Sequence, residues 1–236
     1  MDRFLFLTVD GLARGAVFAA FALALVLIWR GTRVINFAQG AMAAATTYIA
    51  YSVTSATGSY WYGLLAAVVS GFLLGALVER VLIRRLDHSR PLAAVIVALG
   101  LVMVIHAVLG MIYGNDFRPM QLPFSRDPLR VGTVPLLSPY DVFVFAAVGV
   151  VVIGLALLFT RTDLGLKMRA SAFAPDVSRL LGVKVSAMLT LGWALAGAVG
   201  GLAALLVGVN AGPLTPWASS RPCSGGPGLP ALDGFP

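Results

Sequence analysis

The feature that most constrains the fold is the repeated absence of charge over long runs of the chain. The run from Val34 to Val78 holds 45 consecutive residues without Asp, Glu, Lys or Arg. A helix needs about 20 mainly apolar residues to cross a bilayer, so this run is long enough for two spans. The TGS at 57–59 is the expected turn between them. Only 11% of the 236 residues are charged, against about 25% in soluble domains, which predicts an integral membrane protein.

Other uncharged runs complete the predicted set of spans. In the last run, at 185–220, only the part up to about Val209 is strongly apolar. The predicted fold class is therefore all-α, a polytopic membrane helical bundle with about six transmembrane helices. We expect one transmembrane domain over residues 1–216. The six helices are expected near 11–29, 34–56, 60–83, 92–113, 140–160 and 186–209.

Basic residues are concentrated in alternate loops. The loops at 30–33, 80–91 and 161–185 hold eleven of the 17 Lys and Arg residues. Cytoplasmic loops carry an excess of Lys and Arg, which predicts that these loops are cytoplasmic and that both termini lie on the outer side. The net charge of +7 does not indicate a nucleic-acid partner, because such a partner needs a basic face on a soluble domain. The eleven residues are Arg30, Arg33, Arg80, Arg84, Arg85, Arg90, Arg161, Lys167, Arg169, Arg179 and Lys184.

Two amides head a run of small residues in the segment RVINFAQGAMAAATTYIAY, residues 33–51. At about 100° per residue, small and weakly polar side chains form a stripe on one face of the predicted helix. A buried amide without a partner is costly in hydrocarbon. The stripe therefore either bonds another helix or lines a translocation pathway. The candidate pathway residues are Asn36, Gln39, Gly40, Ala43 and Thr47.

The inner loop RTDLGLKMRASAFAPDVSRLLGVKVS, residues 161–186, has an apolar pattern of its own. We expect one or two short helices, broken near Pro175. A plain solvated linker is the alternative, but it would not need an amphipathic face. Such a face is suited to docking into a groove on another protein. The expected apolar side consists of Met168, Phe173, Val177, Leu180 and Leu181, with Lys167, Arg169 and Arg179 in solvent.

Glycines four residues apart indicate close helix packing. The outer loop at about 114–139 contains five prolines, which excludes a long helix there. The single cysteine, Cys223, excludes an internal disulfide. Glu79 beside Arg80 and Arg84 is interpreted as a helix end with local ion pairing. The glycine pairs are Gly11 and Gly15, Gly71 and Gly75, Gly110 and Gly114, and Gly197 and Gly201.

As a set, these stretches resemble permease subunits of the bacterial branched-chain amino acid ABC transporters, the high-affinity leucine/isoleucine/valine type. The resemblance covers about residues 10–216 and also includes ERVLIRRLDHSRPLAAVIVALGL. The family signature near the pathway maps onto Ile35, Asn36, Phe37, Ala38, Gln39 and Gly40. The family's ATPase-coupling segment maps onto Gly165, Met168, Arg169, Ala170, Ala172, Leu181, Gly182 and Val183.

The resemblance implies a multi-pass subunit of the bacterial inner membrane. With a second permease subunit it would form a pathway for branched-chain or related amino acids across the lipid bilayer. It also implies two cytoplasmic ATP-binding subunits and a periplasmic amino-acid-binding protein as partners. The chain contains no Gly-Lys-Ser/Thr of a P-loop, so the energy would come from the ATPases. We expect no cofactor and no enzymatic activity.

Two features depart from the family pattern. The family often has His at the position of Gln39, so a titratable group is missing from the pathway. The family also continues through further membrane helices, whereas residues 217–236 are rich in Pro, Gly and Ser. We expect this tail to be disordered and to reflect a frameshifted or truncated end.

Three other functions stay open. A secondary transporter or channel would need ion-coupling groups inside the membrane, where His106 is the one candidate well inside a span. A lone His is more often a hydrogen-bonded structural residue. An intramembrane enzyme would need a convergent catalytic set, but the second histidine, His88, lies in a loop. A structural subunit without a pathway is the third alternative.

Overall fold

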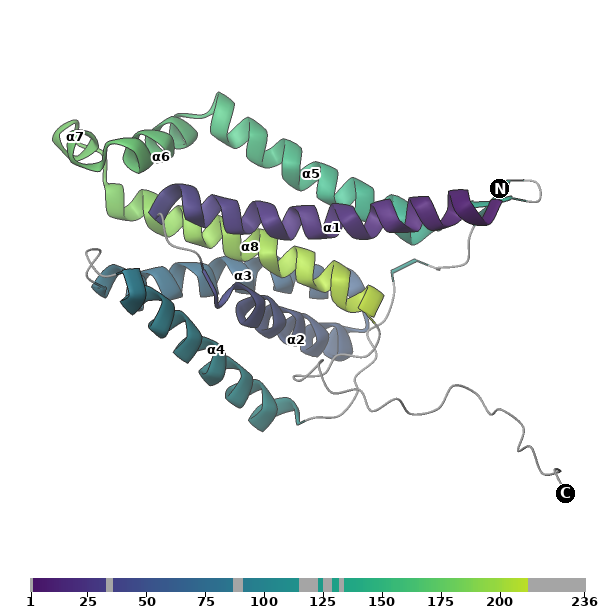
Figure 1. Cartoon of the computed structure of the whole chain (residues 1–236). Coiled ribbons are helices and arrows are strands. Elements are labelled where there is room, and N and C mark those ends of the chain that lie inside the picture. Colours follow the sequence, from purple (N-terminus) through teal and green to yellow (C-terminus); the bar gives the residue numbers. More distant parts are fainter. Residues whose placement is uncertain are drawn as a thin grey trace, which may run out of the picture.

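A computed structural model of the chain describes residues 2–32, 36–86, 91–114, 123–124, 129–131 and 134–211. Long helices dominate it, so the all-α bundle is confirmed (Figure 1). Ile35, His88 and the tail at 217–236 lie outside the described residues. The elements are α1 (Asp2–Thr32), α2 (Gln39–Thr57), α3 (Tyr60–Val81), the 3-10 helix η1 (Ile83–Arg85), α4 (Pro91–Tyr113), β1 (Leu129–Val131), β2 (Val134–Leu137), α5 (Pro139–Arg161), α6 (Asp163–Phe173), α7 (Pro175–Leu180) and α8 (Val185–Ala211).

The six predicted membrane helices are present as α1, α2, α3, α4, α5 and α8. Within the described ranges, five of them are long and apolar enough to cross a membrane, and α2 is not among these five. The reason is composition, because α2 contains six Ser and Thr residues. Much of this helix packs against protein, where a polar hydroxyl can bond the backbone of its own helix instead of facing lipid.

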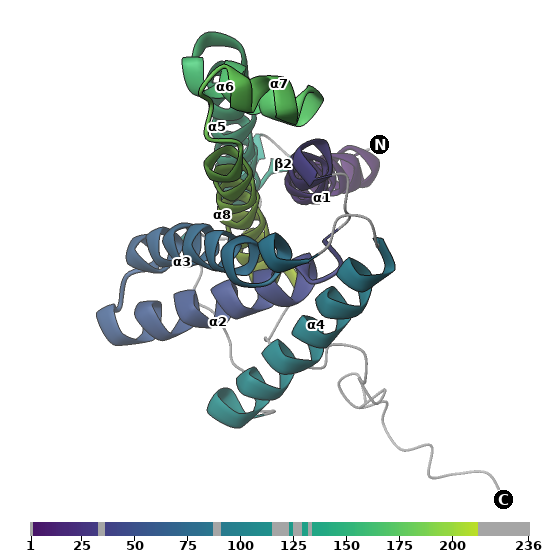
Figure 2. The same ribbon diagram turned by 90° about the vertical axis from the view of Figure 1, so that its left-hand side faces the viewer.

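Helix α8 is the central element of the bundle. It lies between α1 and α5 on one side and α2 and α3 on the other (Figure 2). Of its most apolar stretch, 61% is buried, against 17–28% for the other four candidate spans. The small residues of α8 explain this position, because they let neighbouring backbones approach closely.

Glycines bring α3 and α8 into backbone contact. A Cβ atom at Gly71 would overlap the carbonyl group of Gly197, and one at Gly75 would overlap that of Trp193. Gly201 would place a Cβ 2.8 Å from the carbonyl of Ala67. The close packing expected of these two glycine pairs is confirmed, and we call this contact the glycine seam. Within the described part of the chain, the positions without a neighbouring atom within 4 Å include Gly11, Gly15 and Gly110.

One end of the bundle collects the predicted basic loops. Helices α1, α3 and α5 finish there and α4 and α8 begin there, while α1 begins and α8 ends at the opposite end (Figure 1). The alternation expected from the charge pattern is therefore present, and its assignment to the cytoplasm stays a prediction. We call this end the basic end. Its described members are Arg30, Arg80, Arg84, Arg85, Arg161, Lys167, Arg169, Arg179 and Lys184.

At the opposite end, short turns and caps connect the helices. Gly58, with φ of 69°, ends α2 at the predicted turn. Ser138 and Asp141 form a capping box at the start of α5, which fixes where that helix begins. Between α4 and α5, the strands β1 and β2 pair antiparallel, with Leu129 opposite Leu137. The sequence did not predict this ribbon, although it did exclude a long helix.

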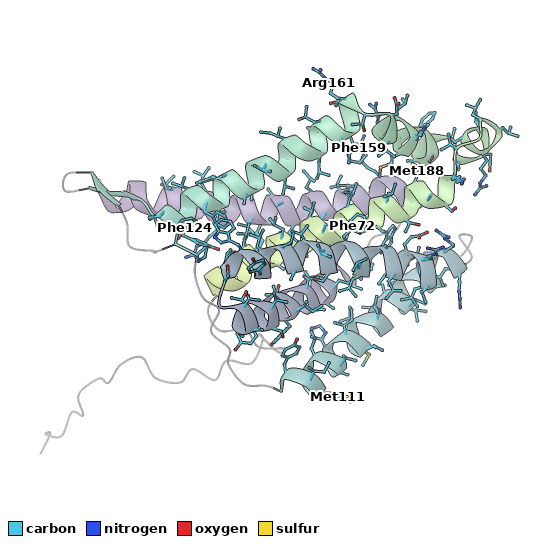
Figure 3. The ribbon with its side chains drawn as sticks, turned by 180° about the vertical axis from the view of Figure 1, so that it is seen from behind. Phe72, Met111, Phe124, Phe159, Arg161 and Met188 are labelled. Atoms are coloured by element: carbon cyan, nitrogen blue, oxygen red, sulfur yellow. The ribbon has the colours of Figure 1, made fainter. Side chains whose placement is uncertain are left out.

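Helix α4 leans away from the other helices (Figures 1 and 2). Near its end, the Tyr113 ring lies 4.8 Å from the Tyr48 ring of α2, and the Ser52 and Tyr113 hydroxyl oxygens are 2.7 Å apart. Other large side chains of α4 are exposed, including Met103 and Met111, which sits at the tip of the helix in Figure 3. Such a surface suits lipid or another membrane subunit.

Candidate functional site

The two amides of the predicted pathway stripe are buried and bonded to each other. Asn36 and Gln39 are 4% and 2% exposed. Asn36 Nδ2 donates to Gln39 Oε1 at 2.9 Å, and Asn36 Oδ1 accepts from the backbone N–H of Ala38 at 3.0 Å. The second bond turns the chain into α2. Asn36 therefore acts locally as the residue that organises the first turn of this helix.

Gln39 connects α2 to the central helix. Its Nε2 donates to the carbonyl oxygen of Ala196 in α8 at 3.2 Å. The amide fits against α8 because position 200 is a glycine, and a Cβ there would overlap Gln39 Nε2. The interhelical cross-bond that we considered for these amides is thus present, and it satisfies groups that would otherwise be buried without partners.

The rest of the predicted stripe is divided between packing and open space. Ala43 and Thr47 are buried, and the Thr47 hydroxyl donates to the Ala43 carbonyl at 2.9 Å. Gly40 is exposed, and no other described part of the chain, apart from its own helix backbone, comes within 4 Å of the position that its Cβ would take. Of the five candidate residues, Gly40 is therefore the one that presents backbone to open space.

The predicted coupling segment forms two short helices at the basic end. Helix α6 ends at Phe173 and α7 begins at Pro175, so the break expected at Pro175 is confirmed. Figures 1 and 2 show α6 and α7 standing at the end of the bundle beside the start of α8. Five of the eight coupling candidates lie in α6, and the other three, Leu181, Gly182 and Val183, lie in the turn between α7 and α8.

Apolar side chains of this segment project into open space. Phe173 is 91% exposed, Leu180 88% and Leu181 78%, and Val177 is also exposed. We call these four residues the apolar tip. Met168 does not join them, because it is half-buried and lines a cavity together with Arg169, Ala172 and Phe173. A membrane end that exposes this much apolar surface outside the spans is typical of a protein interaction site.

The structure explains why two of the coupling candidates are glycines. A Cβ at Gly165 would overlap the carbonyl of Leu158, so this glycine lets α6 pack closely on α5. Gly182 has φ of +80°, which an L side chain adopts only with strain. The Val183 N–H bonds the Ser178 carbonyl at 2.9 Å across this turn, which ends α7 and redirects the chain into α8.

A buried carboxylate lies where α8 begins. Glu79, 3% exposed, pairs with Arg84 through contacts of 3.1 and 3.4 Å. The Thr190 hydroxyl donates to Glu79 Oε2 at 2.6 Å and accepts from Arg84 at 2.7 Å. Arg84 also donates to the Ser186 carbonyl at 3.3 Å. We call these residues the Glu79 cluster, and it ties the end of α3 and η1 to the first turns of α8.

Sequence reasoning identified part of this cluster. The expected ion pairing at Glu79 is confirmed with Arg84. Thr190 was missed, because it lies 106 residues beyond Arg84 and no local pattern indicates the contact. Gly200 was missed as well, although it stands next to the seam glycine Gly201. His106 Nδ1 lies 2.9 Å from the carbonyl of Val102 in the same helix, which fits a structural histidine.

The fold and these contacts define a polytopic α-helical membrane protein, closed by small-residue helix packing and carrying an exposed apolar segment at one end. The sequence pattern of the family described as "Branched-chain amino acid transport system / permease component" matches residues 7–216. The chain belongs to this family and is a multi-pass membrane permease.

Relatives of the chain carry similar names. The high-affinity branched-chain amino acid transport system permease protein BraD of Pseudomonas aeruginosa is 26% identical, over 88% of this chain and 72% of its own length. The probable branched-chain amino acid transport permease protein LivH of Methanocaldococcus jannaschii is 27% identical, over 77% of this chain and 59% of its own. The Escherichia coli protein LivH is 24% identical, over 88% and 71%. No solved structure matches the chain.

Proposed function

We propose that this permease is one half of the translocation unit of an ABC importer for branched-chain or related amino acids in the bacterial inner membrane. A second permease subunit would complete the pathway. Two cytoplasmic ATP-binding subunits would supply the energy, and a periplasmic amino-acid-binding protein would deliver the solute. The names of the relatives support the solute class, and the relatives share the permease description along most of this chain.

The observation that carries the ATPase proposal is the apolar tip. Phe173 and Leu180 are exposed on short helices outside the membrane spans, and Leu181 is exposed in the turn after α7. Water disfavours such a surface, and a partner groove would cover it. Lys167 also remains exposed on α6, where it would contribute to a polar rim.

Movement of the docked segment has a direct route into the bundle. Helix α7 is joined to α8 by the short turn at Gly182. The first turns of α8 are held to α3 by the Glu79 cluster, and its middle is held to α2 by Gln39. Closure of the ATPases would thus reach both helices through α8. This is a two-state element biased from a distant site.

The pathway role of the α2 stripe is part of this proposal. The amides of Asn36 and Gln39 are used inside the chain, so we assign them to positioning α2 on α8. Gly40 has open space beyond it, and it would face the pathway or the second permease subunit. Ala43 and Thr47 would then support the pathway wall from behind.

Co-purification tests the docking proposal. In detergent, the Phe173→Gln/Leu180→Gln variant should co-purify with at least tenfold less ATPase than the wild type does. The matched control is Asp176→Asn/Arg179→Gln, which removes an exposed ion pair of α7 at 3.0 Å and leaves the apolar tip in place. Exposed pairs contribute about 0–1 kcal/mol, so this control should retain the ATPase. Full retention in the apolar variant would reject docking at the tip.

A secondary transporter without an ATPase makes a different prediction. Transport in sealed vesicles would follow a proton gradient and proceed without ATP. Under our proposal, uptake requires ATP inside the vesicle and the binding protein outside, and collapse of the proton gradient leaves it unchanged.

A further inference from the structure

A cavity of about 690 Å³ opens at the basic end between α1, α5, α6 and α8. Its size is within the range of small-molecule sites. Figure 3 shows Phe159 of α5 and Met188 of α8 at this end of the bundle, close to α6. Most of the wall is apolar. The apolar lining includes Leu23, Leu27, Leu155, Phe159, Met188 and Leu189.

Two buried polar groups of the lining residues lack partners. The Ser171 hydroxyl and the Trp193 indole N–H belong to side chains that are 3% and 2% exposed. Neither has a hydrogen-bond partner among the described residues. An indole N–H can only donate, and a hydroxyl can donate or accept. Since leaving such groups unpaired is costly, a ligand with acceptor oxygens would satisfy them.

The cavity is also positively charged. Arg30 from the end of α1 and Arg169 from α6 both line it, and no described acidic residue is among the lining residues. Neither guanidinium belongs to an ion pair in the described part of the chain. Trp29, next to Arg30, is a residue type that concentrates at the headgroup level of membranes. The charge therefore lies where lipid headgroups are expected.

We propose that this cavity binds one anionic phospholipid from the leaflet at the basic end. Arg30 and Arg169 hold its phosphate, since basic pockets between membrane helices recognise such headgroups. The ester oxygens lie between phosphate and acyl chain, and they accept from Ser171 and Trp193. One acyl chain occupies the apolar space between α1 and α5. The site goes beyond the transport proposal, and of the apolar tip only Phe173 is among its lining residues.

Native mass spectrometry of the purified full chain in detergent tests this assignment. The probes are phosphatidylglycerol and phosphatidylcholine at equal concentration, with inorganic phosphate as a third arm. The wild type should retain one phosphatidylglycerol in preference to phosphatidylcholine, and millimolar phosphate should not displace it. The Arg30→Gln/Arg169→Gln variant should lose roughly 25-fold in phosphatidylglycerol retention, about fivefold for each arginine. Arg80→Gln/Arg85→Gln, the control with the same charge loss outside the cavity, should retain it.

A second measurement locates the acyl chain. In a Trp29→Phe/Trp61→Phe/Trp217→Phe variant, Trp193 is the remaining tryptophan, and brominated phosphatidylglycerol should quench it despite its burial. Adding Ala156→Phe, which fills the cavity from α5, should abolish the quenching while the helical circular dichroism stays unchanged. Equal retention of both lipids, displacement by phosphate, or quenching that survives cavity filling would each overturn the proposal.

Discussion

Gln39 donates a hydrogen bond from its side-chain amide to the backbone carbonyl of Ala196, a residue 157 positions further along the chain. The bond joins the first turn of α2 to the middle of α8, the most buried helix of the bundle. It requires that position 200 carry no side chain. A polar residue expected to line the pathway thus has a structural partner within its own chain.

The fit of Gln39 against Gly200 predicts the effect of one methyl group. Gly200→Ala should displace the amide, break the bond to Ala196 and lower the free energy of unfolding by about 1–2 kcal/mol. Gly40→Ala, next to Gln39 on the open face of α2, should change the free energy of unfolding by less than about 0.5 kcal/mol. Unfolding of the purified subunit by denaturant in mixed micelles measures both.

A double-mutant cycle separates the bond from general overpacking. In a Gln39→Ala background, Gly200→Ala should cost much less than it does in the wild type, because the displaced amide is absent. An unchanged cost in that background would mean that the methyl group acts on other neighbours of Gly200.

The glycine seam predicts a strict size limit between α3 and α8. Gly197→Val places two methyl groups against the Gly71 backbone, so we expect a loss of about 3 kcal/mol or failure to fold. Gly154→Val on α5, where nothing lies within 4 Å, is the matched control and should fold normally. Size-exclusion profiles of fluorescently tagged protein provide the measurement, and equal profiles for the two variants would contradict the seam.

The Glu79 cluster predicts that one hydroxyl at the start of α8 stabilises the bundle. Thr190→Val removes a donor from a buried carboxylate and an acceptor from Arg84. The expected loss is about 1–3 kcal/mol, measured by thermal unfolding in detergent. Thr160→Val is the control, because that exposed hydroxyl bonds the carbonyl of Ala156 in its own helix. Equal losses of stability for the two substitutions would contradict a stabilising role of Thr190 in the Glu79 cluster.

Gly182 predicts how firmly α6 and α7 are held to α8. Gly182→Ala forces an L side chain to positive φ at a cost of about 1–2 kcal/mol. We expect the turn to open and proteolytic cleavage between α7 and α8 to become at least fivefold faster. Gly149→Ala, a helical glycine in open space on α5, should leave the cleavage rate unchanged. If the Gly182→Ala variant were cleaved no faster than the wild type, the turn would tolerate a side chain at position 182.

Local patterns in the sequence predicted most elements of the fold. Charge-free runs located six helices, Pro175 separated α6 from α7, and glycines at four-residue spacing indicated the seam. These features depend on residues close together in the chain. The β1–β2 ribbon was missed because prolines in the loop exclude a helix but do not specify strand pairing.

The contacts of the candidate site were less predictable. The pattern around Asn36 and Gln39 allowed either a pathway or a helix cross-bond, and the choice depends on which residue of α8 lies opposite. The contacts of Thr190, and the lack of a described partner for the Ser171 hydroxyl, likewise depend on the relative placement of helices. A single sequence carries little information about such distant neighbours, since the same residue types occur throughout its helices.

Direct backbone contact along the glycine seam makes α3 and α8 one rigid unit. Turning or sliding one helix against the other would drive the carbonyl of Gly197 into the chain at Gly71. A displacement of either helix at one end would therefore move α3 and α8 together along their whole length. In the proposed transport cycle, the deformation of alternating access would fall on the loosely packed neighbours, and α4, leaning outward from its contact with α2, is the helix with the most freedom to supply it.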